Sequence, residues 1–490
     1  MSRQDWQQLL EEVRTRFHVP SFSATIYHNG QVFSVSGGQR DAEAGLPADA
    51  ETLYAIGSCT KSFVAGAVCA LADQGLLGLD DPVRDYIPEF EMYDPYVSRH
   101  LTVRDMLCHR CGLPRHELSW YARLDVLTEE DIVRMFRYLK PNQPFRYKWQ
   151  YSNQMFALAG FLIRRITGKP WQQVVREQLW EPLGITRAAF GPAEAQALGN
   201  CAVPYLYDEG RGAAYAVPHA DIGAMGSAGS IYMATSELIK WDRMLLNGGV
   251  YDGRRVLSEA MCREMTSPQM IRTNDEDNAA PLRPLITNLG YGLGLMTEVF
   301  RGHRVVQHGG HIDGFMADQS FLPDDDFACA ILTNLGEVRG AMVMRYVALE
   351  HVLHGGRDWS QELEQFYRQQ TADQAADRDA LWARRPQNAP CPVPPEAIAG
   401  QYHDDGYGTI TIVPNGADLD VHLGTAVLTA VHYANQYFYL EAPHVLPGVL
   451  IEACVDIDAQ GRVTAFRAAL DVEGPEKICF VRCGGKEETR

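Results

Sequence analysis

The stretch Gly57-Ser58-Cys59-Thr60-Lys61-Ser62-Phe63 predicts an exposed turn that runs into a buried helix. The residues Phe63–Ala72 are apolar on almost every side, as expected of a helix in the middle of a domain. Positions three apart share one face of a helix, so Ser58 and Lys61 should lie side by side at its start. Gly57 leaves room for another group beside them. We therefore expect the fold to be organised around this turn and helix.

A serine beside a lysine can act as a nucleophile without a histidine. A buried lysine has a lowered pKa and can take the serine proton, while the helix N-terminus supplies positive potential and free N–H groups. The alternative for Ser58 and Lys61 is a helix N-cap serine followed by a solvated lysine. The Ser-x-x-Lys spacing alone does not decide between a nucleophile and a cap.

The overall charge limits the classes of partner. The chain of 490 residues carries 62 acidic and 44 basic residues, a formal net charge of -18, which disfavours nucleic acid and anionic membranes. The N-terminal residues 1–13 are polar and lack the apolar core of an export signal, and no apolar run is long enough to span a bilayer. We therefore expect a cytoplasmic protein that binds a small molecule or a short peptide, and neither nucleic acid nor membrane.

The eleven cysteines are scattered along the chain, which favours reduced, buried thiols. Cys108, His109 and Cys111 raise the alternative of a zinc or redox site. No second Cys/His pair follows at structural-zinc spacing, and no thioredoxin-like context surrounds these residues. We therefore expect both thiols to pack in the core, and we expect no metal and no cofactor.

Composition divides the chain into three parts. Residues 1–356 carry a hairpin signal at Asn29-Gly30, several helices, a polar loop over 272–284 and four strand signals, the last two being 317–322 and 327–333. Residues 357–393 are polar and helical and end in a Pro-rich linker. Residues 394–490 alternate in short strands, which predicts a small all-β barrel. We expect this barrel to fold as its own unit and to shape the mouth of the site.

Two further motifs follow Ser58-x-x-Lys61 in order: Tyr151-Ser152-Asn153 and His308-Gly309-Gly310. With the flanking segments Leu107–Pro114 and Glu181–Gly184, they resemble the serine β-lactamase and penicillin-binding-protein-like superfamily, in its branch of class C β-lactamases, D-alanyl-D-alanine carboxypeptidases and esterases. The C-terminal part is similar to the lipocalin-like domain of some members. The resemblance implies an α+β fold: an antiparallel sheet flanked by helices beside an all-helical lobe, with the site between them.

The resemblance also implies a role for each motif residue. Ser58 would be the nucleophile, Lys61 its proton partner, and Tyr151 a second base and later the acid, with a pKa lowered by nearby cations. Asn153 would orient Lys61 and the substrate carbonyl. The backbone N–H groups of Ser58 and His311 would form an oxyanion hole next to Gly309 and Gly310.

His308 stands where β-lactamases of this type carry a lysine that holds the substrate carboxylate, so we expect His308, with Gly309 and Gly310, to bind substrate in a less cationic and roomier site. The alternative for His308 is a histidine at the end of a strand with no role in binding. We expect a serine hydrolase, with a carboxylesterase first and a D-residue peptidase or amidase, or a weak β-lactamase, as alternatives. A non-catalytic binding protein on the same fold is the alternative outside the enzymes. The three intact motifs argue against it.

Overall fold

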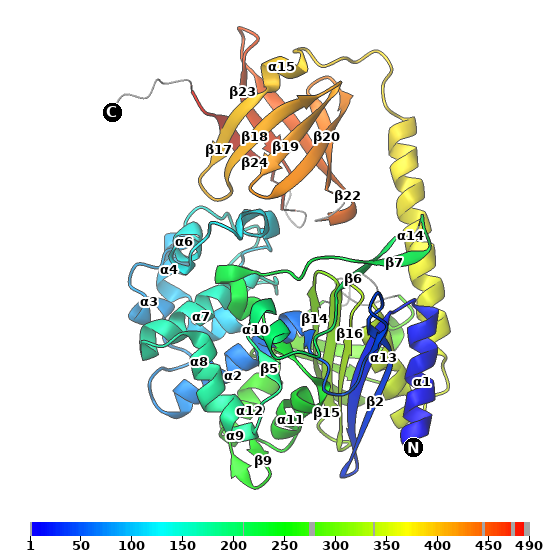
Figure 1. Ribbon diagram of the computed structural model, residues 1–490. Helices are drawn as coiled ribbons and strands as arrows, with labels where there is room; N and C mark the ends of the chain where they lie inside the picture. Colours follow the sequence, from blue (N-terminus) through cyan, green and yellow to red (C-terminus); the bar gives the residue numbers. More distant parts are fainter. Residues whose placement is uncertain are drawn as a thin grey trace.

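The computed structural model describes residues 2–208, 210–273, 280–336, 339–442, 446–471 and 476–484. Within these residues it shows a nine-stranded antiparallel sheet, a lobe of helices and a closed eight-stranded barrel (Figure 1). The predicted α+β class with an appended β-barrel is therefore confirmed.

The sheet has the strand order β11-β12-β13-β14-β15-β16-β1-β2-β3, so strands from the first and last thirds of residues 1–356 pair with each other where β1 lies beside β16. The predicted hairpin turns at Asn29 and Gly30, both with positive φ, as a tight two-residue turn requires. The strands are β1 (Ser21–His28), β2 (Gln31–Asp41), β3 (Leu46–Pro47), β11 (Met270–Ile271), β12 (Ile286–Tyr291), β13 (Met296–Phe300), β14 (His303–Ile312), β15 (Phe315–Leu322) and β16 (Phe327–Thr333).

Helices cover both faces of the sheet. On one face α1 (Arg3–Arg16) and α13 (Gly340–Val352) pack on Phe22 and Ile331, and on the other α11 (Thr235–Leu246) packs against β1, β15 and β16. The helical lobe encloses α2 (Thr60–Asp73), which is buried from Thr60 to Leu71. Around it lie α3 (Val83–Tyr86), α4 (Pro95–His100), α5 (Val103–Leu107), α6 (Glu129–Met135), α7 (Asn153–Thr167), α8 (Trp171–Val175), α9 (Glu181–Leu183), α10 (Pro192–Ala197) and α12 (Glu259–Thr266).

Strand β14 is longer than the sequence pattern indicates. The alternation predicts a strand over 304–307 followed by the third motif, whereas the strand runs through His308, Gly309 and Gly310 to Ile312. Two adjacent glycines have low strand propensity, so the pattern loses its signal there. The ladder with β15 supplies the pairing that propensity does not, from Val306↔Phe321 to Ile312↔Phe315.

The C-terminal barrel stands on the helical lobe, and α14 (Trp359–Ala383) runs up to it beside the sheet (Figure 1). None of the described helices, α14 included, combines the length and apolarity needed to cross a bilayer. Buried residues of the barrel such as Tyr402 and Tyr407 belong to the same apolar cluster as the lobe. The barrel strands are β17 (Gly400–Asp404), β18 (Gly408–Asn415), β19 (Asp418–Leu423), β20 (Ala426–Ala434), β21 (Tyr437–Ala442), β22 (Leu446–Ile457), β23 (Val463–Ala468) and β24 (Ile478–Arg482).

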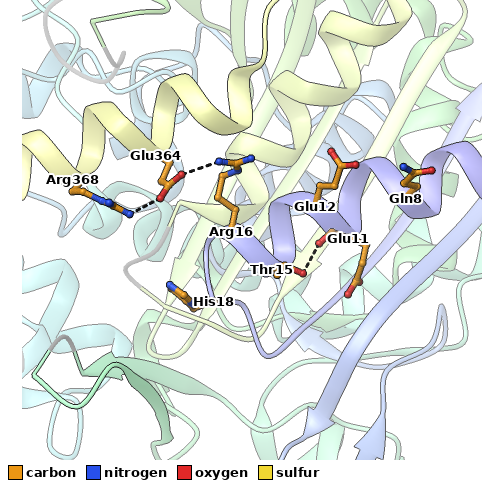
Figure 2. A pocket seen from close by; sticks show the side chains of 8 residues that line it. All are labelled: Gln8, Glu11, Glu12, Thr15, Arg16, His18, Glu364 and Arg368. Atoms are coloured by element: carbon orange, nitrogen blue, oxygen red, sulfur yellow. Dashed lines mark hydrogen bonds and ion pairs between the residues drawn. The ribbon is translucent and has the colours of Figure 1, made fainter.

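A polar groove of about 640 Å³ separates α1 from the start of α14 (Figure 2). Glu364 bridges its two sides, with ion pairs to Arg16 at 3.0 Å and to Arg368 at 2.6 Å. The residues that line this groove include no serine and no cysteine. The groove is larger than the pocket at Ser58 but lies on the opposite side of the sheet from α2, so we assign it no chemistry.

Candidate active site

Ser58 sits in the short turn η1 (Gly57–Cys59), which leads directly into α2. Lys61 Nζ lies 2.9 Å from Ser58 Oγ and 2.6 Å from the carbonyl oxygen of Ala228. The phenol of Tyr151 donates a hydrogen bond to Ser58 Oγ at 2.7 Å. The structure thus brings together the three residues that the motifs nominate for catalysis.

Lys61 is fully buried, and this burial lowers the pKa of its amine well below the usual value. The carboxylate of Glu117 opposes the shift by favouring the charged form, and the Arg115 cation adds to it. A neutral amine has a lone pair, and at 2.9 Å from Ser58 it can accept the hydroxyl proton. Lys61 therefore has the environment of a general base.

Tyr151 differs from the expectation. We expected nearby cations to lower the pKa of this phenol, but burial raises it, and the hydrogen bond to Ser58 and the Arg115 cation only partly offset the effect. The Arg115 guanidinium lies 4.6 Å and Lys61 Nζ 4.8 Å from the ring centroid. The motif residues indicate the nearby cation but not the burial of the phenol, which has the larger effect on its pKa. Tyr151 is consequently a protonated donor suited to serve as an acid.

The backbone of β14 passes very close to the nucleophile turn. Gly57 has φ of +48°, and a Cβ atom there would lie 2.6 Å from the His311 backbone nitrogen. At Gly310 a Cβ atom would lie 1.9 Å from the carbonyl oxygen of Ile56 and 3.2 Å from the Ser58 nitrogen. Glycine at both positions permits this approach, which brings the backbone of His311 close to the turn that carries Ser58. An oxyanion hole formed by the N–H groups of Ser58 and His311 is compatible with this approach and stays a prediction.

His308 lines the same pocket, but its ring is turned into the protein. The side chain is 1% exposed, Nδ1 is 2.6 Å from the Gly309 carbonyl oxygen, and Nε2 is 3.0 Å from the Tyr291 hydroxyl. A neutral ring fits both contacts, with Nδ1 donating and Nε2 accepting. Burial lowers the pKa of His308 to about 3, which keeps it uncharged. The geometry favours a wall of the pocket, and direct contact of His308 with substrate stays a prediction.

Asn153 begins α7 and reaches the pocket, although not to the predicted partner. Its amide nitrogen donates to Glu117 Oε1 at 2.9 Å, while Lys61 takes the Ala228 carbonyl as its second partner. Among the hydrogen bonds of the described residues, none joins Asn153 to Lys61. Glu117 and Arg115 line the pocket but are not among the predicted site residues, although both follow closely on Leu107–Pro114, one of the segments that carries the family resemblance.

The pocket at Ser58 has a volume of about 440 Å³ and is lined by several cations. Its lining includes four arginines against two carboxyl groups, Glu117 and Asp318, and burial raises the pKa of Asp318 to about 7. The expectation of a less cationic site compares His308 with a lysine at the same position and stays a prediction, while the arginines supply cations elsewhere in the pocket. The arginines are Arg115, Arg272, Arg339 and Arg345.

Arg272 shows why the sequence missed part of this lining. The pattern over 272–284 predicts a mobile surface loop, of which residues 274–279 lie outside the described residues. Arg272 itself is 5% exposed, and its guanidinium lies 4.7 Å from the centroid of the Trp149 ring. Leu282 is fully buried. Thr273, Ala280, Arg283 and Pro284 are exposed, as predicted for a surface loop, so among the described residues of the segment the prediction is wrong only at Arg272 and Leu282.

Cys108 and Cys111 are both buried free thiols, as predicted for core residues. Between them, His109 packs in an aromatic cluster with ring centroids 4.5 Å from Tyr151 and 4.8 Å from Tyr291. Its Nδ1 accepts a hydrogen bond from the Ser152 N–H. In the described part of the chain no group of three or more His, Cys, Asp or Glu residues could hold a metal ion. His109 supports the Tyr151 ring.

This sheet with its helical lobe, and a serine, lysine and tyrosine at their junction, define the class of serine β-lactamases and penicillin-binding-protein-like proteins. The family described as Beta-lactamase matches residues 6–353, and the chain belongs to this family. Its relatives are hydrolases and penicillin-binding proteins, so the protein is a hydrolase of this family.

The chain is similar to several curated proteins and solved structures. An unguisins hydrolase of Aspergillus campestris is 28% identical, over 84% of this chain and 77% of its own. Penicillin-binding protein 4 of Amycolatopsis lactamdurans is 26% identical, over 68% and 85%. Among solved structures, the octameric penicillin-binding protein homologue of Pyrococcus abyssi superposes with a TM-score of 0.63 at 21% identity, over 98% of this chain and all of its own. The D-amino acid amidase of Ochrobactrum anthropi gives 0.61 at 24%, over 72% and 97%. These two structures share the fold.

Proposed function

We propose that the protein is a serine hydrolase that forms an acyl-Ser58 intermediate on an amide bond of an amino-acid derivative or short peptide. The observation that carries this proposal is the contact of Ser58 Oγ with both Lys61 and Tyr151. One neighbour is suited to take a proton and the other to give one. An amine is a poor leaving group unless it is protonated, so a phenol held beside the reacting oxygen suits amides.

The first half of the reaction follows from these contacts. Lys61 takes the Ser58 proton as Oγ bonds to the substrate carbonyl carbon, and the oxyanion accepts hydrogen bonds from the N–H groups of Ser58 and His311. Tyr151 then gives its proton to the leaving nitrogen as the C–N bond breaks. The proton on Lys61 returns to the tyrosinate, so both groups recover their starting states in the acyl-enzyme.

In the second half, water attacks the acyl-Ser58 ester. Lys61 assists by taking a proton from the attacking water, Tyr151 gives its proton to Ser58 Oγ as the acid product departs, and the proton on Lys61 then returns to Tyr151. The names of the relatives support a peptide-like substrate: one is an unguisins hydrolase, and one solved neighbour is a D-amino acid amidase. A substrate containing a D-residue is therefore our first choice.

The second candidate is a carboxylesterase, which the sequence places first. The uncharged wall at His308 favours it, because a neutral ester needs no cation there. The two candidates use the same acyl-enzyme and differ in the need for an acid at the leaving group. Tyr151→Phe separates them, since it should slow amides far more than p-nitrophenyl esters, whose leaving group departs without protonation.

The test is a panel of D- and L-aminoacyl amides, p-nitrophenyl esters and a chromogenic cephalosporin, run with the wild type and Ser58→Ala. Ser62→Ala is the matched control, because Ser62 lies one turn further along α2 and bonds the Cys59 carbonyl and Trp241 instead of Lys61. Intact mass after a fluorophosphonate should increase by one adduct that maps to Ser58. Equal labelling of Ser58→Ala would overturn the proposal.

A further inference from the structure

The barrel contacts the segment 115–123, which belongs to the helical lobe, at two places. The Tyr407 hydroxyl, just before β18, is 2.7 Å from His116 Nδ1. The backbone N–H of Thr425, in the turn between β19 and β20, donates to the Ala122 carbonyl oxygen at 2.8 Å. Both barrel contacts fall on a segment without long helices or strands. The barrel is therefore a direct support of this segment.

The fit at these two places is close. Gly424 has φ of +54°, and a Cβ atom there would lie 1.6 Å from the Ala122 carbonyl oxygen. His116 has φ of 42°, a left-handed conformation that is uncommon for a residue other than glycine. Its ring is 2% exposed and also contacts the Lys140 carbonyl oxygen at 2.9 Å. Strained conformations persist where the surroundings determine them, and here part of the surroundings is the barrel.

The segment 115–123 also carries polar lining of the active-site pocket. On either side of His116, Arg115 lies over the Tyr151 ring and Glu117 accepts from Asn153. From the side of the lobe, Gln154 Nε2 donates to the carbonyl oxygens of Arg115 and His116 at 2.8 and 3.2 Å. The segment is thus held between α7 and the barrel, and its residues Arg115 and Glu117 line the pocket.

The same segment reaches the opposite wall of the pocket. Tyr121 donates to Asp313 Oδ2 at 2.7 Å, and Asp313 lies in the turn that follows His311 at the end of β14. A displacement of residues 115–123 would therefore be felt at both the Tyr151 wall and the β14 wall. A continuous chain of contacts therefore leads from the barrel, through residues 115–123, to the pocket.

We propose that the C-terminal barrel sets the substrate preference of the active site, with Tyr407 and His116 as positioning residues that place Arg115 and Glu117. The inference rests on the proposed serine hydrolase activity. In it, Arg115 meets a substrate carboxylate and Glu117 a substrate ammonium group, and neither Tyr407 nor His116 touches the reacting atoms. Loss of the Tyr407 hydroxyl should alter discrimination between charged and neutral substrates while the acylation machinery stays in place.

The test compares Tyr407→Phe with the wild type in the full-length protein. Tyr433→Phe is the matched control, because the Tyr433 hydroxyl bonds the Leu381 carbonyl of α14 and so joins the barrel to a different segment. The readouts are kcat/KM for an aminoacyl amide with a free amino group and for its N-acetyl analogue, and for a dipeptide amide and the corresponding free acid. Titration with a fluorophosphonate gives the concentration of active enzyme.

We expect Tyr407→Phe to lower the preference for the charged member of at least one pair by about threefold to tenfold, with fluorophosphonate labelling within about twofold of the wild type. Gly424→Ala should shift the preference in the same direction, and it keeps the proposal testable if Tyr407→Phe folds poorly. Unchanged ratios in both variants, or an equal shift in Tyr433→Phe, would overturn the inference. A wild type with neither turnover nor an adduct on Ser58 would instead overturn the proposed function.

Discussion

Gly310→Ala is expected to disable the oxyanion hole without removing any catalytic side chain. The new Cβ atom would lie 1.9 Å from the Ile56 carbonyl oxygen, and since ordinary contact begins at 3.4 Å, β14 and the nucleophile turn must separate by about 1.5 Å. The His311 N–H would then be too far from the oxyanion. One such donor is worth about 10²–10³ in kcat, or roughly 3–4 kcal/mol of transition-state stabilisation.

Gly309→Ala provides the matched control, because the nearest atom to its Cβ would be the Ala317 carbonyl oxygen at 3.9 Å. We expect it to retain kcat within about threefold of the wild type, as one methyl group in a pocket changes binding only modestly. The assay is kcat and kcat/KM on the best amide and ester of the panel, with thermal unfolding to confirm that both variants fold. Wild-type rates in Gly310→Ala, or equal losses in both variants, would refute the placement of the oxyanion hole.

Three further outcomes are expected. Lys61→Met should lower kcat by about 10²–10⁴, because it removes the base. In the wild type, kcat/KM should fall as pH drops through the lowered pKa of Lys61, because protonation of the amine also removes the base. A pH-rate profile in which kcat/KM does not fall at low pH would contradict this. Asp105→Ala should lower the free energy of unfolding by about 3 kcal/mol, because Asp105 is fully buried and bonds Arg146 at 2.7 Å. Burial opposes ionisation of Asp105, but the bonds from Arg146, the Thr102 N–H and Arg110 outweigh it and lower its pKa. The contribution of Asp105 to the free energy of unfolding of the wild type is therefore present at neutral pH and is lost as pH falls through that lowered pKa. Urea denaturation at several pH values measures this contribution. An Asp105→Ala variant as stable as the wild type at pH 7 would contradict the prediction. EDTA should leave activity unchanged, and a large loss reversed by zinc would point back to Cys108, His109 and Cys111.

The sequence predicted the elements whose local pattern and tertiary setting agree. The apolar run after Ser58 is a buried helix, the turn at Asn29 and Gly30 joins β1 to β2, and 327–333 is the strand β16. Each of these segments carries its own signal within a few residues. The three motifs are recognisable for the same reason, because each consists of a few consecutive residues.

The remaining features depend on neighbours that are distant in sequence. The raised pKa of Tyr151 follows from burial under residues of several elements, and no local pattern reports it. The strand at Gly309 and Gly310 is held by pairing with β15, against its own propensity. Arg115 and Arg272 point into the pocket because of the rings of Tyr151 and Trp149, which lie far away along the chain.

Helix α14 has a mechanical consequence. Residues 368–380 are all exposed. Within the described part of the chain the helix is anchored near its ends, by Trp359 and Leu363 on the sheet side and by Leu381 and Trp382 at the barrel. A helix advances about 1.5 Å and turns about 100° per residue, so the length of this free span fixes both the height and the rotational phase of the barrel anchor. Adding or removing one residue would turn that anchor to another side, whereas any exposed substitution that keeps the helix would leave it in place. The position of the barrel anchor therefore depends on the number of residues in this span and hardly on which residues they are.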